Sequence, residues 1–223
     1  MTPTRETERP ASAKGSGELS LQESVNARRL PAARPGAITL ARHGEPALSR
    51  RVRLSAEEYD AWWARYEVGG LKPGQTPPAG LLATARDAEV IVSSTRPRSV
   101  ETAQAVAGDR TFSSEAVMVE APLPPPRWPA FLKLKPRTWG VIARTNWWFF
   151  NGHRGRESRA EAKNRAEAAA DRLEGLASGG GDVLVLAHGF FNAMVGLELK
   201  RRGWRLVRNE GYRYWSARRY CRE

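Results

Sequence analysis

A short apolar run that leads directly into a charged turn constrains the fold of this chain more than any other stretch. Residues 37–41 read Ala-Ile-Thr-Leu-Ala, which is typical of a buried strand. The next residues are Arg42, His43, Gly44 and Glu45. Ligands of an open α/β sheet bind beyond the carboxyl ends of its strands. The run therefore predicts a sheet edge where an arginine and a reactive histidine face a ligand, and the glycine permits the turn.

A second apolar run ends in the same way. Residues 182–187 read Asp-Val-Leu-Val-Leu-Ala, and they are followed by His188 and Gly189. We expect a strand here and a helix over 190–202. Because parallel strands carry their carboxyl ends to one edge of a sheet, the two strand-end histidines should lie close together.

A third stretch adds an anion-binding signal. Residues 88–92, Ala-Glu-Val-Ile-Val, are expected to form a strand that runs into Ser93 and Ser94, and a helix is expected to start at Pro97. The first turn of a helix exposes free N–H groups that favour anions. Arg98 lies in that turn, where a cation gains nothing from the helix dipole, so its position indicates a bound anion.

Other elements complete an alternating α/β pattern. A capping box, Ser55 to Glu58, opens a helix that should run to residue 67. Its aromatic residues recur at helical spacing and are expected to pack in the core rather than form a ligand platform; they are Tyr59, Trp62, Trp63 and Tyr66. The remaining elements expected are a helix ending at 86, a strand at 116–119, a helix over 157–177 and a last strand at 212–216.

Residues 121–156 break the pattern. From 122 to 156 the chain contains six prolines, four tryptophans and seven Lys or Arg residues, but no acid. We expect an insertion that folds over one end of the sheet as a lid or pocket wall. An irregular aromatic plug that covers core residues is the alternative. Arg127 and Trp128 are the residues expected to face the substrate.

Composition narrows the possible partners. The 223 residues include 36 Lys or Arg against 24 Asp or Glu, a net charge of +12, which favours an anionic substrate, nucleic acid or an anionic membrane surface. The single cysteine, Cys221, excludes a disulfide framework and suits a cytoplasmic protein. Neither a signal peptide nor a membrane span is expected. Residues 1–35 are rich in Pro, Ser, Gly and Arg and are expected to form a loosely ordered arm, with 36–223 as the folded domain.

The three motifs together resemble the histidine phosphatase superfamily, also called the phosphoglycerate mutase-like family. The resemblance extends from about residue 37 to 193. It rests on Arg42-His43-Gly44, on Ser93-Ser94 through Arg98 to Thr102-Ala103, and on Ala187-His188-Gly189. It implies a three-layer α/β/α fold with a mostly parallel central sheet. The implied activity is that of a histidine acid phosphatase-type phosphomonoesterase, acting on a phosphorylated small molecule through a phosphohistidine intermediate.

The resemblance also implies roles for individual residues. His43 would attack phosphorus, while the side chains of Arg42, Arg98 and His188 surround the phosphoryl oxygens beside Gly44. The attacking nitrogen must be unprotonated, so the other ring nitrogen must hold its proton against a partner such as a backbone carbonyl. Catalysis is then mostly positioning and charge stabilisation, and neither a metal nor an organic cofactor is implied.

The leaving alkoxide needs a proton, and a carboxylic acid is the family's donor. Glu120 is our choice because it follows the expected strand at 116–119. It lacks the neighbouring arginine that many members have, so Glu45 and Glu157 remain alternatives.

Three other functions stay open. A phosphoglycerate mutase is disfavoured because Ser49 stands where many mutases have an asparagine. A metal hydrolase would use His43 and His188, with His153 as a candidate third ligand, and no carboxylate is spaced as a partner to either strand-end histidine. A non-catalytic polyanion-binding protein fits the charge and the tryptophans, but has no need of histidines at two strand ends. Neither the natural substrate nor the oligomeric state is predicted.

Overall fold

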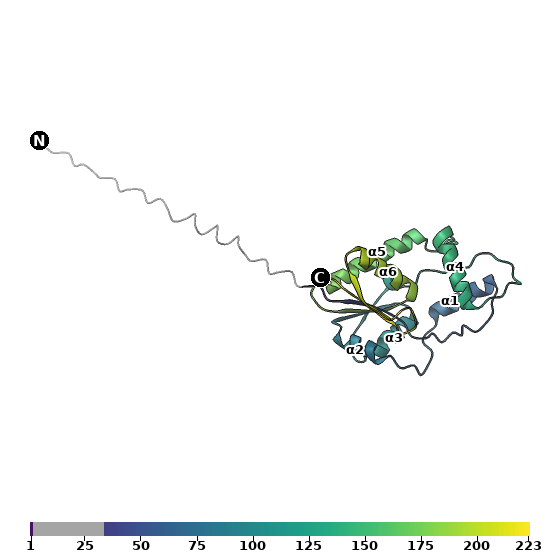
Figure 1. Ribbon diagram of the computed structural model, residues 1–223, viewed down its shortest axis with the longest axis horizontal. Helices are drawn as coiled ribbons and strands as arrows, with labels where there is room; N and C mark the ends of the chain where they lie inside the picture. Colours follow the sequence, from purple (N-terminus) through teal and green to yellow (C-terminus); the bar gives the residue numbers. More distant parts are fainter. Residues whose placement is uncertain (2–33) are drawn as a thin grey trace. The chain divides into compact units, whose positions relative to one another are not determined.

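The computed structural model describes Met1 and residues 34–223. The arm predicted at 1–35 therefore lies almost wholly outside the described residues. The folded part is built on a six-stranded sheet in the order β3-β2-β4-β1-β6-β5 (Figure 1). Its strands are β1 (Ile38–Arg42), β2 (Val90–Ser94), β3 (Ser113–Glu115), β4 (Val183–Ala187), β5 (Arg205–Asn209) and β6 (Ala217–Cys221).

The sheet is mostly parallel, as predicted. Strands β3, β2, β4 and β1 run parallel to one another, whereas β6 pairs antiparallel with β1 and with β5. In the register of β1 with β4, Arg42 lies opposite Ala187. The residues that follow the two strands, His43 and His188, are thereby brought to the same edge.

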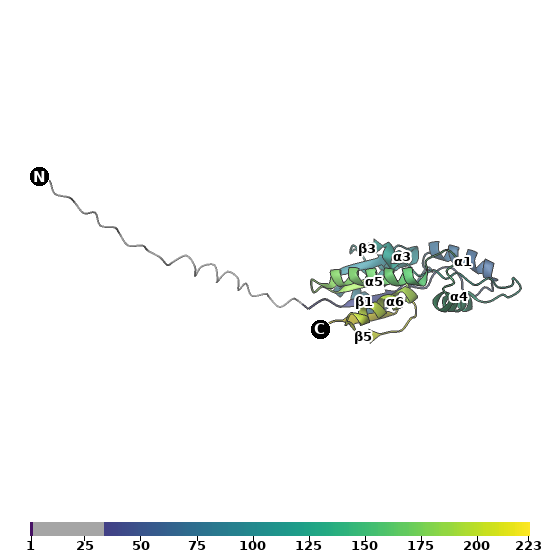
Figure 2. The same ribbon diagram turned by 90° about the horizontal axis from the view of Figure 1, so that it is seen from above.

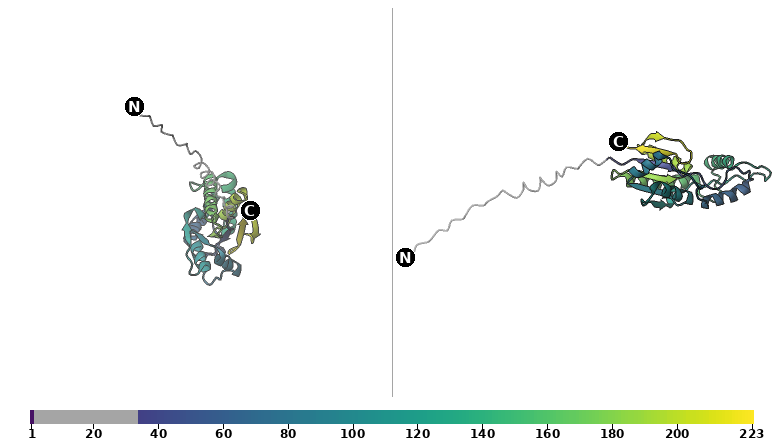
Figure 3. Two further views of the ribbon diagram at one scale, coloured as in Figure 1. Left: turned by 90° about the vertical axis from the view of Figure 1, so that its left-hand side faces the viewer. Right: turned by 90° about the horizontal axis from the view of Figure 1, so that it is seen from below.

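Helices cover both faces of the sheet. On one face, α5 (Arg159–Ala177) and α6 (Gly189–Arg201) pack alanine and leucine side chains against β1 and β4. On the other face, α2 (Ala79–Asp87) and α3 (Pro97–Ala107) pack against alternate residues of β2 and β4. Figures 2 and 3 show this three-layer arrangement from other sides.

The remaining two helices form a separate layer beyond the carboxyl ends of the strands (Figure 1). They are α1 (Ala56–Val68) and α4 (Pro136–Phe150). The predicted capping box of α1 is present, with Ser55 Oγ accepting from the Glu58 N–H and the Glu58 carboxylate accepting from the Ser55 N–H. Buried aromatic side chains of α1 stack on one another and on Trp139 of α4. This aromatic core fixes α4 over the sheet edge.

Two predicted strands were wrong. Residues 116–118 form a short 3₁₀ helix that follows β3, because Met118 turns inward to pack beneath α5. Residues 212–216 form an irregular turn in which Trp215 has a positive φ of 64°, and the chain pairs as a hairpin of β5 and β6 instead. No helix in the described part of the chain is long and apolar enough to cross a membrane.

Candidate active site

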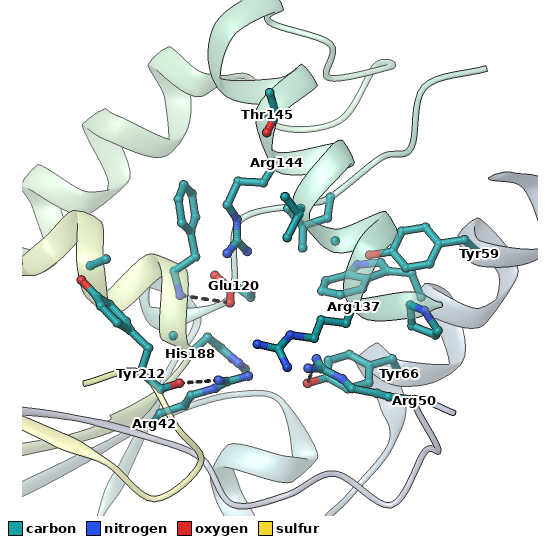
Figure 4. Close-up of a pocket in the computed structure, with 18 of the residues that line it drawn as sticks. Arg42, Arg50, Tyr59, Tyr66, Glu120, Arg137, Arg144, Thr145, His188 and Tyr212 are labelled. Atoms are coloured by element: carbon teal, nitrogen blue, oxygen red, sulfur yellow. Dashed lines mark hydrogen bonds between the residues drawn. The ribbon is translucent and has the colours of Figure 1, made fainter. Parts of the chain in front are cut away.

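A cavity of about 630 Å³ opens beyond the carboxyl ends of β1 and β4, between the sheet edge and α4 (Figure 4). It brings together most of the residues predicted from the sequence. Those that line it are Arg42, His43, Arg98, Glu120 and His188. Gly44 lies next to this set without lining the cavity.

His43 is held as a neutral imidazole with one defined free nitrogen. Its ring is buried, and Nδ1 lies 2.7 Å from the carbonyl oxygen of Gly44. Because a carbonyl only accepts, Nδ1 carries the proton, and Nε2 keeps its lone pair. Burial lowers the pKa of His43 well below its usual value, and the positive charges of Arg98 and Arg42 lower it further. This is the tautomer that a nucleophile at Nε2 requires.

His188 has the opposite tautomer. Its Nδ1 faces Nη2 of Arg98 at 3.3 Å, and a guanidinium can only donate. The proton is therefore on Nε2, which donates to Ser94 Oγ at 2.9 Å. Burial, the charge of Arg98 and the presence of His43 lower the pKa of His188 well below its usual value. The two rings meet edge to face, with their centroids 5.2 Å apart.

The two buried histidines should make the fold sensitive to acid. A histidine whose pKa is lower in the folded chain binds fewer protons there than in the unfolded chain, whose pKa is about 6.5. Stability contributed by His43 and His188 is therefore complete above that value and falls as the pH drops below it. The expected slope is up to about 1.4 kcal/mol per pH unit for each ring. Chemical unfolding measured between pH 7.5 and 5.5, with NMR of the imidazole C2 protons, checks this; rings that titrate near pH 6.5 would contradict it.

The two predicted phosphate-binding arginines differ in how far their side chains are buried and held by protein partners. Arg42 donates from Nη1 to the Tyr212 carbonyl at 2.6 Å and stacks on the ring of Tyr214. Arg98 is fully buried and donates to the Tyr66 carbonyl and to the Glu67 carboxylate, both at 2.9 Å. Part of its charge is thus already neutralised by the end of α1, which the sequence motif did not indicate.

Gly44 is needed for a close approach of the chain. A Cβ atom added there would lie 2.4 Å from the indole ring of Trp215, closer than real contacts allow. The Gly44 N–H donates to Thr102 Oγ1 at 3.0 Å, which ties the turn after β1 to helix α3. The glycine therefore positions His43 between these elements.

Of the three candidate acids, only Glu120 lines the cavity. Its Oε1 accepts from the N–H of Phe191 at 2.9 Å and of Ala121 at 3.2 Å. The Oε2 atom has only a long contact of 3.4 Å to the N–H of Phe190. The Glu120 carboxylate thus contacts the first turn of α6, the helix that begins directly after His188, and its Oε2 atom is only weakly hydrogen-bonded.

The other two acids point elsewhere. Glu45 is exposed and lies 3.8 Å from Lys72 Nζ. Glu157 makes a two-pronged ion pair with Arg165, at 2.6 and 2.7 Å, on the wall of a different depression. The third histidine, His153, lies outside the cavity and contacts the carbonyl of Arg156. No group of three or more side chains able to hold a metal ion occurs among the described residues.

Three further arginines line the cavity that the motifs did not single out. They are Arg50, from the segment after β1, and Arg137 and Arg144, from α4 (Figure 4). The 7-residue spacing of the last two places them on one face of a helix, but the prolines before Pro136 obscured that helix in the sequence.

The wall of the cavity also differs in detail from the prediction. Arg127 and Trp128 do not line it. Trp128 packs against Trp139 with the two rings tilted by 56°, and Arg127 lines a separate depression. The aromatic residues of α1 pack in the core as predicted, and they also form part of the cavity wall.

Known structures share the fold. A phosphoglycerate mutase from Bacillus anthracis str. Sterne is 19% identical, with 86% of this chain and 93% of that chain aligned at a TM-score of 0.54. A mycobacterial glucosyl-3-phosphoglycerate phosphatase complexed with VO3 is 20% identical over 76% and 83% of the two chains, at a TM-score of 0.50. A mutant phosphoserine phosphatase from Entamoeba histolytica, in complex with phosphoserine, is 17% identical over 74% and 80%, also at 0.50.

Comparison by sequence identifies the family of the chain. No curated protein matches the chain significantly. The family model described as histidine phosphatase superfamily (branch 1) matches residues 79–212, which is more than half of the chain. The match includes Arg98, Glu120 and His188, while Arg42 and His43 precede it. The chain belongs to the histidine phosphatase superfamily, branch 1.

Proposed function

We propose that this chain is a phosphomonoesterase of the histidine acid phosphatase type, which transfers the phosphoryl group first to His43 and then to water. The observation that carries the proposal is the state of His43: a neutral ring with its proton on Nδ1, and a second histidine and two arginines beside it. A buried imidazole that cannot readily take up a proton keeps its lone pair for attack.

The first half of the reaction would form the phosphohistidine. Nε2 of His43 attacks phosphorus, the bond between phosphorus and the ester oxygen breaks, and the electron pair stays on that oxygen. Glu120, acting as a carboxylic acid, would supply the proton that the leaving alkoxide needs and would become a carboxylate. Arg42 and Arg98 stabilise the charge on the phosphoryl oxygens, which is the main work left to the protein in phosphoryl transfer.

The second half would restore the enzyme. A water molecule gives a proton to the Glu120 carboxylate and attacks phosphorus, the bond from phosphorus to Nε2 breaks, and inorganic phosphate leaves. His188 would help in both halves, because its Nε2–H can turn from Ser94 Oγ to a phosphoryl oxygen.

Hydrolysis and transfer can be separated directly. We expect inorganic phosphate to be released from simple aryl and alkyl phosphates, with no dependence on added metal and with little transfer to a second hydroxyl compound. An assay of released phosphate, run beside a transfer assay with phosphoglycerate, measures both. Transfer without hydrolysis would favour a mutase, and loss of activity on chelation would contradict the mechanism.

A further inference from the structure

The cavity holds more positive charge than one phosphoryl group requires. Among the described residues, five arginines line it and Glu120 is the one carboxylate. Arg98 is paired with Glu67, and it and Arg42 are the two arginines that the proposed mechanism assigns to the reacting phosphate. The surplus consists of Arg50, Arg137 and Arg144.

Among the described residues, none of these three side chains forms an ion pair with a carboxylate. In the described part of the chain, Arg137 and Arg144 make neither a hydrogen bond nor an ion pair, and Arg50 donates only to the Tyr66 hydroxyl, at 3.2 Å. The Nε atoms of Arg50 and Arg144 are buried with no hydrogen-bond partner. A buried, unsatisfied donor on a cation is costly and needs an explanation, such as a bound anion.

Arg144 is the most constrained of the three. Its guanidinium lies 3.9 Å from the centre of the Phe190 ring, which fixes the plane of the donor fork. Burial lowers the pKa of Arg144, and the charge of Glu120 opposes that effect. Figure 4 shows Arg144 reaching from α4 to the side of Glu120, and Arg137 reaching from the same helix toward the centre of the cavity.

The surface around these arginines is largely apolar. The nearby wall includes Leu123, Trp148 and Phe190, and exposed Val141 and Phe149 lie at the outer side. Apolar walls with a few placed charged groups are typical of a small-molecule site. An apolar or aromatic part of a ligand would therefore fit between two charged ends.

We propose that the substrate is a phosphomonoester with a second anionic group, a carboxylate or a phosphate, which Arg144 and Arg137 bind with help from Arg50. This inference rests on the proposed phosphatase function. The reacting phosphate would lie against His43, and the second anion would lie under α4. Both anions can form two parallel hydrogen bonds with an arginine fork.

The test compares two substrates that differ in one charge. They are 4-(phosphonooxy)phenylacetate and its amide, whose leaving groups have nearly the same basicity. Wild-type protein should favour the acid in kcat/KM by about 10- to 100-fold, the discrimination expected of charged hydrogen bonds. A third substrate, 4-(phosphonooxy)benzylphosphonate, tells whether the site prefers a phosphate-sized anion to a carboxylate.

Variants then locate the second anion. In Arg144→Gln and Arg137→Gln the preference for acid over amide should fall toward one, and Arg144→Lys should recover only part of it because the fork is lost. Arg127→Gln is the matched control, since Arg127 belongs to the same basic segment but lines a different depression. It should keep the wild-type preference, and thermal unfolding of each variant confirms that it folds.

The possible failures are distinct. Equal kcat/KM for acid and amide in the wild type, or an unchanged preference in both α4 variants, would overturn the second-anion site while hydrolysis of the amide kept the proposed function intact. A wild-type protein that hydrolyses none of the three compounds would overturn the proposed function itself.

Discussion

Replacement of His43 by alanine is expected to abolish turnover, with a loss on the order of 10⁴- to 10⁶-fold in kcat, as is typical when a hydrolase loses its nucleophile. No other described group in the cavity has a free imidazole nitrogen, because both ring nitrogens of His188 contact protein atoms. The measurement is release of phosphate from an aryl phosphate, because its phenolate leaving group departs with little need of a proton donor.

A matched histidine serves as the control. His153 lies outside the cavity, and His153→Ala should keep wild-type activity. Circular dichroism of both variants excludes unfolding as the cause of a loss. Activity of His43→Ala above about one per cent of wild type would rule out a covalent role for this residue.

Replacement of Glu120 by glutamine is expected to have the second largest effect, and the effect should depend on the leaving group. An alkyl phosphate departs as a strongly basic alkoxide and needs a proton, so the loss should be about 10²- to 10⁴-fold. Nitrophenolate departs almost unaided, so the loss on nitrophenyl phosphate should be much smaller. Because the glutamine oxygen can still accept from the N–H groups at the start of α6, the fold should be preserved.

Glu45→Gln is the control for this variant, because Glu45 is exposed and does not line the cavity. It should leave both substrates unaffected. Equal losses for Glu120→Gln on alkyl and nitrophenyl phosphates would indicate a binding role, and no loss on either would assign the proton to another donor.

The sequence predicts the centre of the site because the chemistry lies at strand ends. Two apolar runs that end in His-Gly can only meet if their strands are parallel and lie side by side, and β1 and β4 do so with Arg42 opposite Ala187. The helix that starts at Pro97 carries Arg98 to the same edge. These features can be predicted from local sequence alone, because they do not depend on contacts between distant parts of the chain.

The parts that could not be predicted depend on contacts far apart in the chain. Glu67 pairs with Arg98 because α1 ends next to the start of α3, and no spacing in the sequence links the two residues. Likewise, Arg137 and Arg144 reach the cavity only because Trp139 packs on the aromatic residues of α1 and fixes the rotation of α4. The sequence of this basic, proline-rich segment predicts neither the packing of α4 on α1 nor which face of α4 lines the cavity.

The errors in the strands have a similar origin. The apolar residues 116–119 are typical of a strand by composition, yet Met118 is buried by a tight turn under α5. The buried face of helix α5 is rich in alanine and shares one core cluster with Met118. Tertiary packing here overrides local propensity.

The central claim is that phosphorus becomes bonded to His43, and trapping that intermediate tests it most directly. Wild-type protein mixed briefly with nitrophenyl phosphate and quenched in base should carry one phosphate that is stable in base and lost in acid, on the peptide that contains His43. Mass spectrometry of the base-quenched digest should find it in His153→Ala and not in His43→Ala. Phosphate on any other residue, or full turnover with no phosphorylated peptide at any time after mixing, would contradict the mechanism.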